Sequence, residues 1–397
     1  MPHEVSGAKA TNNERLPSPA GSETYPQRRY GHYTLPEWQT RLKYLDPQSP
    51  DAAAAVAGLI EIINDDDVAP FTRRQAALTL GRIGEAAVEA VPHLVALMTD
   101  ESADEATIVW SIKALSLMGP AAHASTPALI STLENQRSPL VARQACFEAL
   151  GRIGVAHPDV LPALIQVLSG ARKIRNDETT ALRGGAADAV SLIGPSASPV
   201  VPALIRATVD PNETVRRKVF EALESMGGRA DVAVPAMVEA LMFDESAAVR
   251  DAAEAALATA GPDATLALRK LSTTDDPELR LRAVRGLRQM GVAARPAEKD
   301  LWAALQDADE KVRIEAAQAL SNISATPQQI VPVLVECLTS RQRTVRLRAH
   351  RQLVGMGEAA QAAIGQLEQL ANHERADVRR LAAETLRKIR DAAAPAE

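Results

Sequence analysis

The sequence predicts an all-α solenoid, a superhelix of about ten helical hairpins stacked side by side. Three observations support this prediction: a sequence unit that recurs along the chain, apolar residues at helical spacing within that unit, and a composition poor in aromatic residues. Hydrophobic residues make up 46% of the chain but aromatic residues only 3%. The core is therefore expected to consist of Ala, Leu, Val and Ile, which suits helices in close contact. No segment reads as a convincing strand.

The recurring unit is R-x10-G-x7-P. Its glycine position recurs in steps of 35, 35, 40, 33, 34, 30, 33 and 33 residues when Ser324 is counted in the eighth place. An arginine stands eleven residues before this position, except where Ile108 replaces it, and a proline stands eight residues after it in six repeats. The glycines are Gly84, Gly119, Gly154, Gly194, Gly227, Gly261, Gly291 and Gly357. The prolines are Pro92, Pro127, Pro162, Pro202, Pro235 and Pro332.

The chain begins with two segments that lack the unit. Residues 1–27 contain too few large apolar groups to offset the entropy of ordering, and we expect a disordered N-terminal tail without a secretory signal. Residues 28–49 are predicted to cap the solenoid. Trp38, Leu42 and Leu45 follow the i, i+4, i+7 spacing of a short amphipathic helix that could cover the first hairpin.

The repeats are expected to occupy residues 50–391, each as a hairpin of a first helix, A, and a second helix, B. Apolar residues such as Val249, Ala253 and Leu257 fall on one face of helix B. The glycine supplies the left-handed residue that ends helix B, and the proline falls near the start of the next helix A. One hairpin cannot bury its own apolar stripe, so the hairpins stack. Residues 392–397 remain as a C-terminal tail.

One repeat is longer than the others. The 40-residue step contains Ser169–Thr180, where the turn between helices A and B gains about five residues. Insertions of this kind usually map to a loop on one face of the solenoid.

The recurring arginines define a structural ladder. In five repeats an aspartate stands six residues before the ladder arginine, and in a sixth Asp275 stands one place nearer. Such an aspartate could cap helix B while it pairs with an arginine of its own or the next repeat. A feature present in nearly every repeat serves stacking rather than one site. The ladder arginines are Arg73, Arg143, Arg183, Arg216, Arg250, Arg280, Arg313, Arg346 and Arg379, and the five aspartates are Asp67, Asp177, Asp210, Asp244 and Asp307.

A charged row stands five residues after the ladder arginine, away from the apolar stripe, where it should lie on an exposed face of helix B. Acids dominate this row in repeats three to five, and bases appear in repeats seven and nine. The row two residues after the ladder adds further bases. The candidate partner-binding residues in these rows are Glu148, Asp188, Glu221, Arg282, Arg285, Arg348 and Arg351.

The basic half of this surface has two interpretations. The segment Arg341–Arg351 holds five arginines and a histidine without one acid, although the chain is acidic overall. Arg282, Glu315 and Arg348 could pair across adjacent repeats as a solvated network that contributes little to stability. Alternatively, the cluster is a docking surface.

Trp110 is a further candidate for partner binding. It stands two residues after Ile108, in the repeat that lacks the ladder arginine. It could be an exposed anchor of the kind that forms interface hot spots, or it could fill the gap left by the missing arginine.

The composition argues against several classes of function. A net charge of −6 gives no overall attraction to nucleic acid or anionic membranes. Cys146 and Cys337 are far apart and belong to no Cys/His cluster, which argues against a disulfide framework or zinc site and fits a reducing compartment. No apolar stretch looks long enough to span a bilayer. We expect a cytoplasmic protein without metal, cofactor or catalytic residues.

Several stretches resemble bacterial HEAT repeats of the type also found in phycobilisome lyases. They include RRQAALTLGRIG and VARQACFEALGRIG, with VPHLVALM and VPALIRA between them. The resemblance covers roughly residues 50–390. It implies a curved, armadillo-like array in which the B helices line the concave side. It does not specify a function, because this scaffold hosts many roles.

The sequence therefore favours a non-enzymatic scaffold or adaptor that binds a protein or peptide partner along an extended, charge-segregated surface. Two alternatives remain: a HEAT-fold enzyme such as a bilin-lyase-like protein, and a nucleic-acid binder that uses the Arg-rich C-terminal third. We expect no membrane partner, and we consider nucleic acid a less favoured partner than protein.

Overall fold

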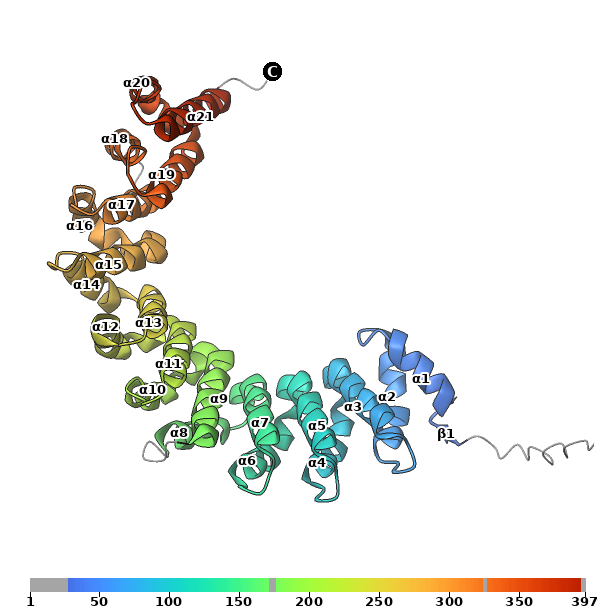
Figure 1. Cartoon of the computed structure of the whole chain (residues 1–397). Coiled ribbons are helices and arrows are strands. Elements are labelled where there is room, and N and C mark those ends of the chain that lie inside the picture. Colours follow the sequence, from blue (N-terminus) through green and yellow to red (C-terminus); the bar gives the residue numbers. More distant parts are fainter. Residues whose placement is uncertain (1–27, 171–175, 324–326, 394–397) are drawn as a thin grey trace, which may run out of the picture.

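In the part of the chain that the structure describes, ten helical hairpins follow one another along a curved array (Figure 1). The structure, a computed structural model, describes residues 28–170, 176–323 and 327–393. Each hairpin is one repeat, numbered 1 to 10 from the N-terminus. The predicted all-α solenoid is confirmed. Helix B of each repeat lines the concave side of the arc and helix A lies on the convex side, as the family resemblance implied (Figure 1).

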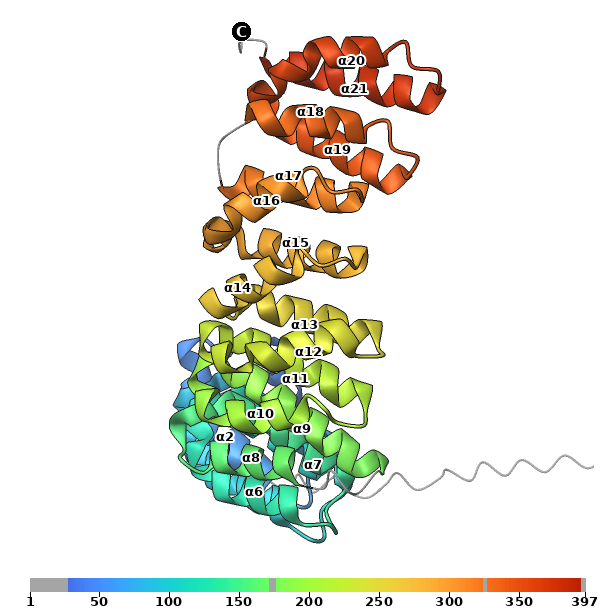
Figure 2. The same ribbon diagram turned by 90° about the vertical axis from the view of Figure 1, so that its left-hand side faces the viewer.

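The A helices are α2 (Pro50–Ile63), α4 (Val91–Thr99), α6 (Thr126–Glu134), α8 (Val160–Ser169), α10 (Val201–Ala207), α12 (Val234–Phe243), α14 (Pro262–Leu271), α16 (Glu298–Ala304), α18 (Pro327–Cys337) and α20 (Ile364–Leu370). The B helices are α3 (Pro70–Ile83), α5 (Glu105–Met118), α7 (Leu140–Ile153), α9 (Asp177–Ile193), α11 (Glu213–Met226), α13 (Ala247–Thr259), α15 (Pro277–Met290), α17 (Glu310–Ile323), α19 (Arg343–Gly355) and α21 (Ala376–Ala393). In Figure 2 the hairpins from α12 to α21 lie one above another as layers.

Short 3-10 helices connect most repeats, which the sequence did not predict. They are η1 (Gly84–Ala90), η2 (Gly119–Ser125), η3 (Gly154–Ala156), η4 (Gly194–Val200), η5 (Gly227–Ala233), η6 (Gly291–Ala297) and η7 (Gly357–Ala363). Residues three apart on such a helix point the same way, and Ala230 and Ala233 of η5 are both fully buried. No such helix separates α13 from α14, where Pro262 directly follows Gly261, and this accounts for the short 30-residue step.

The aligned glycines all have positive φ. Gly84 has φ 70° and ψ −128°, and Gly154 has φ 61° and ψ −143°. These ψ values lie far from the left-handed helical value of about +47°, so the predicted left-handed cap is corrected to a conformation that is essentially open only to glycine. Ser324, counted in the eighth place of the glycine series, lies outside the described residues.

The N-terminal capping segment packs on repeat 1. It consists of the antiparallel strands β1 (Arg29–Tyr30) and β2 (Tyr33–Thr34) followed by α1 (Leu35–Tyr44). The Trp38 side chain is only 1% exposed, and its indole N–H donates to the carbonyl of Tyr30 at 2.9 Å. A Cβ on Gly58 of α2 would lie 2.6 Å from the Trp38 ring, so glycine permits this close approach. The tail predicted for residues 1–27 lies outside the described residues.

Three sequence expectations about local structure were wrong. The two short strands were not foreseen. Leu45 is partly buried but follows the end of α1 in an extended conformation, so it does not extend the amphipathic helix. Pro332 lies inside α18, which begins with Pro327, instead of near its first turn.

The stretch Asp177–Ala207 meets the length and hydropathy expected of a membrane span, contrary to the sequence expectation. The fold uses this stretch differently. It comprises α9, η4 and α10, and the chain turns at Gly194, whose φ is 66°. Its two α-helices belong to the successive repeats 4 and 5, in which apolar residues such as Val190 and Leu204 are fully buried.

Candidate partner-binding surface

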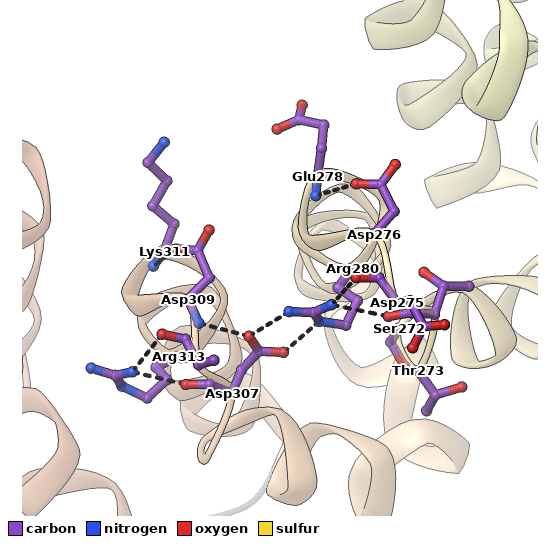
Figure 3. Close-up of polar contacts among 12 residues, drawn as sticks. Ser272, Thr273, Asp275, Asp276, Glu278, Arg280, Asp307, Asp309, Lys311 and Arg313 are labelled. Atoms are coloured by element: carbon purple, nitrogen blue, oxygen red, sulfur yellow. Dashed lines mark hydrogen bonds and ion pairs between the residues drawn. The ribbon is translucent and has the colours of Figure 1, made fainter.

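Each well-formed rung of the ladder joins two A–B turns. Arg280 Nη1 donates to the carbonyls of Thr274 and Asp275 in its own turn, at 3.0 and 2.9 Å. Its Nε and Nη2 donate to the two oxygens of the Asp307 carboxylate in the next repeat, at 2.7 and 3.0 Å (Figure 3). The arginine therefore holds its own turn and the neighbouring one in register through a bidentate, charge-assisted contact.

Two further rungs make the same bidentate contact with the next repeat and are more deeply buried, although Arg183 Nη1 has no hydrogen-bond partner among the described residues. Arg183 donates to both oxygens of Asp210, with side chains 2% and 1% exposed. Arg216 donates to both oxygens of Asp244, with side chains 9% and 8% exposed. These contacts join repeats 4, 5 and 6 along the edge formed by the A–B turns.

The other rungs use different acceptors. Arg143 and Arg346 pair with Glu178 and Asp377 of the following repeats, and Arg313 with Glu336 in the following helix A. Among the remaining three, Arg73 pairs with Asp66 of its own turn, Arg250 donates to the carbonyls of Asp244 and Glu245, and Arg379 donates to those of His373 and Glu374.

The ladder aspartates do not cap helix B, which corrects the sequence expectation. Asp210 accepts the backbone N–H of Asn212 at 2.9 Å, two residues ahead. Asn212 is itself the N-cap of α11 and accepts from Thr214 and Val215. The aspartate therefore shapes the turn before the helix, while its carboxylate remains available to the arginine of the preceding repeat.

The predicted acidic strip is neutralised within the solenoid. Each of its three acids has a basic partner on the same or a neighbouring B helix, and all three acids are about half exposed. The pairs are Glu148 with Arg152, Asp188 with Lys218 and Glu221 with Arg217. Since each partner supplies a compensating charge, this half of the concave side offers little net negative charge.

A hollow of about 300 Å³ lies between α7 and α9, beside two of these acids. Glu148 and Asp188 line it together with the aromatic ring of Phe147 and the half-exposed Leu192. A Cβ on Gly185 would lie 2.5 Å from the Phe147 ring, so the ring packs directly on the glycine backbone.

Arg282 was predicted to be exposed, and this was wrong. Its side chain is 7% exposed and pairs with Asp251 at 2.7 Å, Glu254 at 3.2 Å and Glu278 at 3.0 Å. Asp251 and Glu254 belong to the preceding repeat, and Glu278 lies on the same helix as Arg282. Arg282 therefore does not pair with Glu315 of the following repeat, contrary to the sequence prediction. Arg282 is therefore buried while its partners Asp251 and Glu278 remain 64% and 60% exposed, and its guanidinium group is not free to meet a partner.

Glu254 pairs with this arginine from the preceding repeat. It stands four residues after the ladder arginine, at a position that is apolar in most repeats. It is 3% exposed. Burial raises its pKa to about 7, although Arg285 and Arg282 act in the opposite direction. The interface between α13 and α15 therefore contains a carboxyl group that takes up a proton more readily than an ordinary glutamate does.

Glu315 of α17 is, after Glu254, the second buried acid beside these arginines, and its side chain is 0% exposed. Arg288 Nε lies 2.7 Å from Glu315 Oε2, Arg285 Nε lies 3.7 Å from Oε1, and Arg348 Nη1 pairs with Oε1. The three arginines come from α15 and α19, the B helices on either side. Arg288 was missed in the sequence, although it follows Arg282 and Arg285 at three-residue spacing.

The Arg-rich segment divides into buried and exposed groups. Arg346 and His350 are buried, and burial lowers the pKa of His350. Within the described part of the chain, the exposed Arg341, Arg343 and Arg351 have no ion pair. Among the predicted contact residues, Arg351 is exposed and has no ion pair in the described part of the chain, whereas the other charged ones each have a partner.

Trp110 is neither fully exposed nor fully buried. The Lys113 ammonium lies 5.4 Å from the centre of its ring, within the range of a cation–π contact. Ile108 itself packs against the core, so the absence of the ladder arginine does not leave an open gap there.

The described residues bring together no group of three His, Cys, Asp or Glu side chains that could hold a metal ion. Cys146 and Cys337 are free and buried. Burial raises the pKa of Cys146 to about 12 and that of Cys337 to about 11, so neither thiol is poised as a nucleophile.

A family model for HEAT repeats matches residues 42–116, 170–258 and 264–353. These matches cover more than half of the chain, and the protein therefore belongs to the HEAT-repeat family. No curated protein matches the sequence.

Solved structures of karyopherins have a similar fold. Kap121p matches with 16% identity and a TM-score of 0.54 over 90% of this chain and 43% of its own. Kap95p, in a structure with RanGDP, matches with 15% identity and a TM-score of 0.55 over 90% of this chain and 55% of its own. Kap121p bound to the extreme C-terminus of the phosphatase Cdc14p matches with 14% identity and a TM-score of 0.55. The chain spans about half the length of these proteins, and at this identity the likeness concerns the fold alone.

Proposed function

We propose that this protein is a non-enzymatic scaffold or adaptor that binds a protein partner on its concave side. The B helices follow one another along one continuous, curved face (Figure 1). The observation that carries the proposal is that polar and charged residues of these helices, such as Asp188, Gln318 and Arg351, are exposed. Repeat arrays use extended concave surfaces of this kind to bind partners.

The similar solved structures support the kind of partner. Kap121p has been solved with the C-terminus of Cdc14p, with Ulp1p and with Ste12p, which are protein partners of that karyopherin. Because the likeness is one of fold, it supports a protein or peptide partner for this chain without identifying it.

The two halves of the concave side contribute differently to this proposal. Arg285, Arg348 and Arg351 are partly or well exposed in repeats 7 and 9 and are proposed as contact residues. We propose a secondary role for the acids, because Glu148, Asp188 and Glu221 already have basic partners. Trp110 is proposed as a contact at the margin of the surface, through the exposed part of its ring. We also propose a cytoplasmic location, supported by the two unpaired thiols.

A photo-crosslinking experiment tests the proposal. Benzoylphenylalanine is placed at Gln318, exposed on helix α17 of the concave side, and separately at Gln369, exposed on helix α20 of the convex side. The full-length protein is irradiated in an extract of its source cells. We expect one or a few defined protein adducts at Gln318 and not at Gln369. Equal labelling at both positions, or adducts only at Gln369, would contradict a concave binding surface.

A further inference from the structure

The arginines around Glu315 have more hydrogen-bond donors than this buried acid can accept. A carboxylate offers about four lone-pair sites, whereas three guanidinium groups have about fifteen N–H bonds. Arg285 also approaches Glu254 at 3.5 Å, but that acid already pairs with Arg282. The side chains of Arg285, Arg288 and Arg348 are 30%, 25% and 49% exposed, whereas Glu315 is 0% exposed. The buried Glu315 carboxylate therefore holds the three arginines in place, and part of each arginine side chain remains exposed to solvent.

Arg351 extends the same cluster. It follows Arg348 by three residues on α19, is exposed, and has no ion pair within the described part of the chain. Residues three apart are neighbours on a helix surface. On the next repeat Glu384 is engaged by Lys388 at 3.6 Å, so the nearby acid already has a cation of its own. The four arginines thus retain a surplus of positive charge.

We propose that Arg285, Arg288, Arg348 and Arg351, here named the basic surface, bind an extended acidic segment of the protein partner. This inference rests on the proposed function and specifies the chemistry of the partner. Arginine is suited to this role because its planar guanidinium group binds carboxylates through two parallel hydrogen bonds. Glu315 preorganises the arginines, which reduces the entropy lost when the segment binds.

The spacing of the helices sets the length of the segment. The basic surface runs from α15 across α17 to α19, which is two interhelical steps of about 8–10 Å each. An extended chain advances about 3.3 Å per residue, so about six residues span the surface. A segment with several Asp or Glu residues within six positions is the ligand that fits.

Nucleic acid fits this surface less well. The cluster is confined to three neighbouring repeats of a chain whose net charge is −6. Two buried carboxylates, those of Glu254 and Glu315, lie beneath it. Sequence-tolerant binding of single strands relies on a continuous basic groove with aromatic side chains for base stacking, whereas aromatic residues make up only 3% of the chain.

Fluorescence anisotropy with a labelled octaglutamate peptide tests the proposal on the full-length protein at low salt. We expect saturable binding that weakens as salt is added, because exposed charges are screened beyond about 10 Å at 0.1 M. Arg351→Glu should raise the Kd about tenfold, which corresponds to 1.4 kcal/mol. The matched control is Arg137→Glu, which reverses an exposed arginine of repeat 3 that has no ion pair in the described residues. It should change the Kd less than about twofold.

Three results would overturn the inference: no binding of octaglutamate, equal effects of the two charge reversals, or tighter binding of an oligodeoxythymidylate with the same number of charges. The last result would identify a nucleic-acid surface. Arg351→Gln, which removes the charge without reversing it, separates loss of binding from loss of fold, since its melting temperature should equal that of the native chain. If one of these three results is obtained while Gln318 still forms its adduct in the native chain, the concave binding function stands and the acidic-segment inference fails. If Gln318 forms no adduct in the native chain, the proposed function itself fails.

Discussion

At the scale of single residues, the ladder arginines differ in what their removal leaves behind. Arg183 and Asp210 are both nearly fully buried, so Asp210 would keep a buried charge without its bidentate partner if Arg183 were truncated. Arg250 occupies the same sequence position but donates to the carbonyls of Asp244 and Glu245, which are neutral and partly accessible. Arginines at the same position of the repeat therefore need not contribute equally to the free energy of unfolding.

Arg183→Ala should lower the free energy of unfolding by about 3–5 kcal/mol, because it leaves an uncompensated buried carboxylate. Arg250→Ala should lower it by about 1 kcal/mol, the usual contribution of a hydrogen bond. Urea denaturation monitored by circular dichroism measures both. Similar losses in the two variants would show that burial of the acid does not determine the effect.

At the scale of packed helices, buried charge concentrates where α13, α15 and α17 meet. Glu254 of α13 faces Arg282 and Arg285 of α15, and Glu315 of α17 faces Arg288 of the same helix. Other pairs of neighbouring B helices combine apolar contacts, as where the Phe147 ring packs on Gly185, with ion pairs whose acids are more exposed, as in Asp188–Lys218. The interface between repeats 6 and 7 should therefore respond to pH more than an apolar interface does.

We expect the stability of this interface to fall as pH rises between about 4.5 and about 7. The pKa of Glu254 is raised from 4.5 to about 7 in the fold. In this window the folded chain binds the proton and the unfolded chain does not. Stability therefore decreases with pH, by at most about 1.4 kcal/mol per pH unit. Asp251, Arg282, Arg285 and Glu315 are the charged groups that face Glu254 and bear on this titration.

Glu254→Gln removes the titrating group and retains an amide that can accept from Arg282. Its free energy of unfolding, relative to that of the native chain, should increase as pH rises through this window. Urea denaturation at pH 4.5, 6 and 7.5 makes the comparison. A constant difference between the two chains would mean that Glu254 is ionised in the fold throughout.

At the scale of the whole molecule, the ten repeats form an open arc in which contacts link neighbouring hairpins (Figures 1 and 2). In such an array stability is approximately a sum over repeats and nearest-neighbour interfaces. The curved face extends over many repeats, so a partner can contact distant repeats that do not contact each other.

A local perturbation should therefore remain local. In Arg183→Ala, amide hydrogen exchange should accelerate in α9 and α11, on either side of the broken contact. It should be unchanged in α19 and α21, because those helices lie beyond several intact interfaces. Mass spectrometry of deuterated peptides resolves these regions. Uniform acceleration along the chain would indicate that the solenoid unfolds as one cooperative unit.

Much of the fold was predictable because the sequence pattern is local. The positive φ of Gly84 and Gly154 and the start of α4 at Val91, one residue before Pro92, depend on residues a few positions away. The ladder was recognisable for the same reason: its arginines recur at one place in the unit. The 3-10 connections were missed because their only signal, small residues three apart as at Ala230 and Ala233, is brief.

The sequence by itself determined the repeat, the class of fold and the positions on helix B that lie away from its apolar stripe. The tertiary structure alone decided which charged residues remain accessible. Helical periodicity describes one helix, and it placed Arg282 and Arg351 on the same kind of face. The lateral neighbours differ: Arg282 meets Glu254 of the preceding repeat and is buried, whereas Arg351 has no ion-pair partner among the described residues and stays exposed. Accessibility in a solenoid depends on residues about one repeat away, because stacking places them side by side.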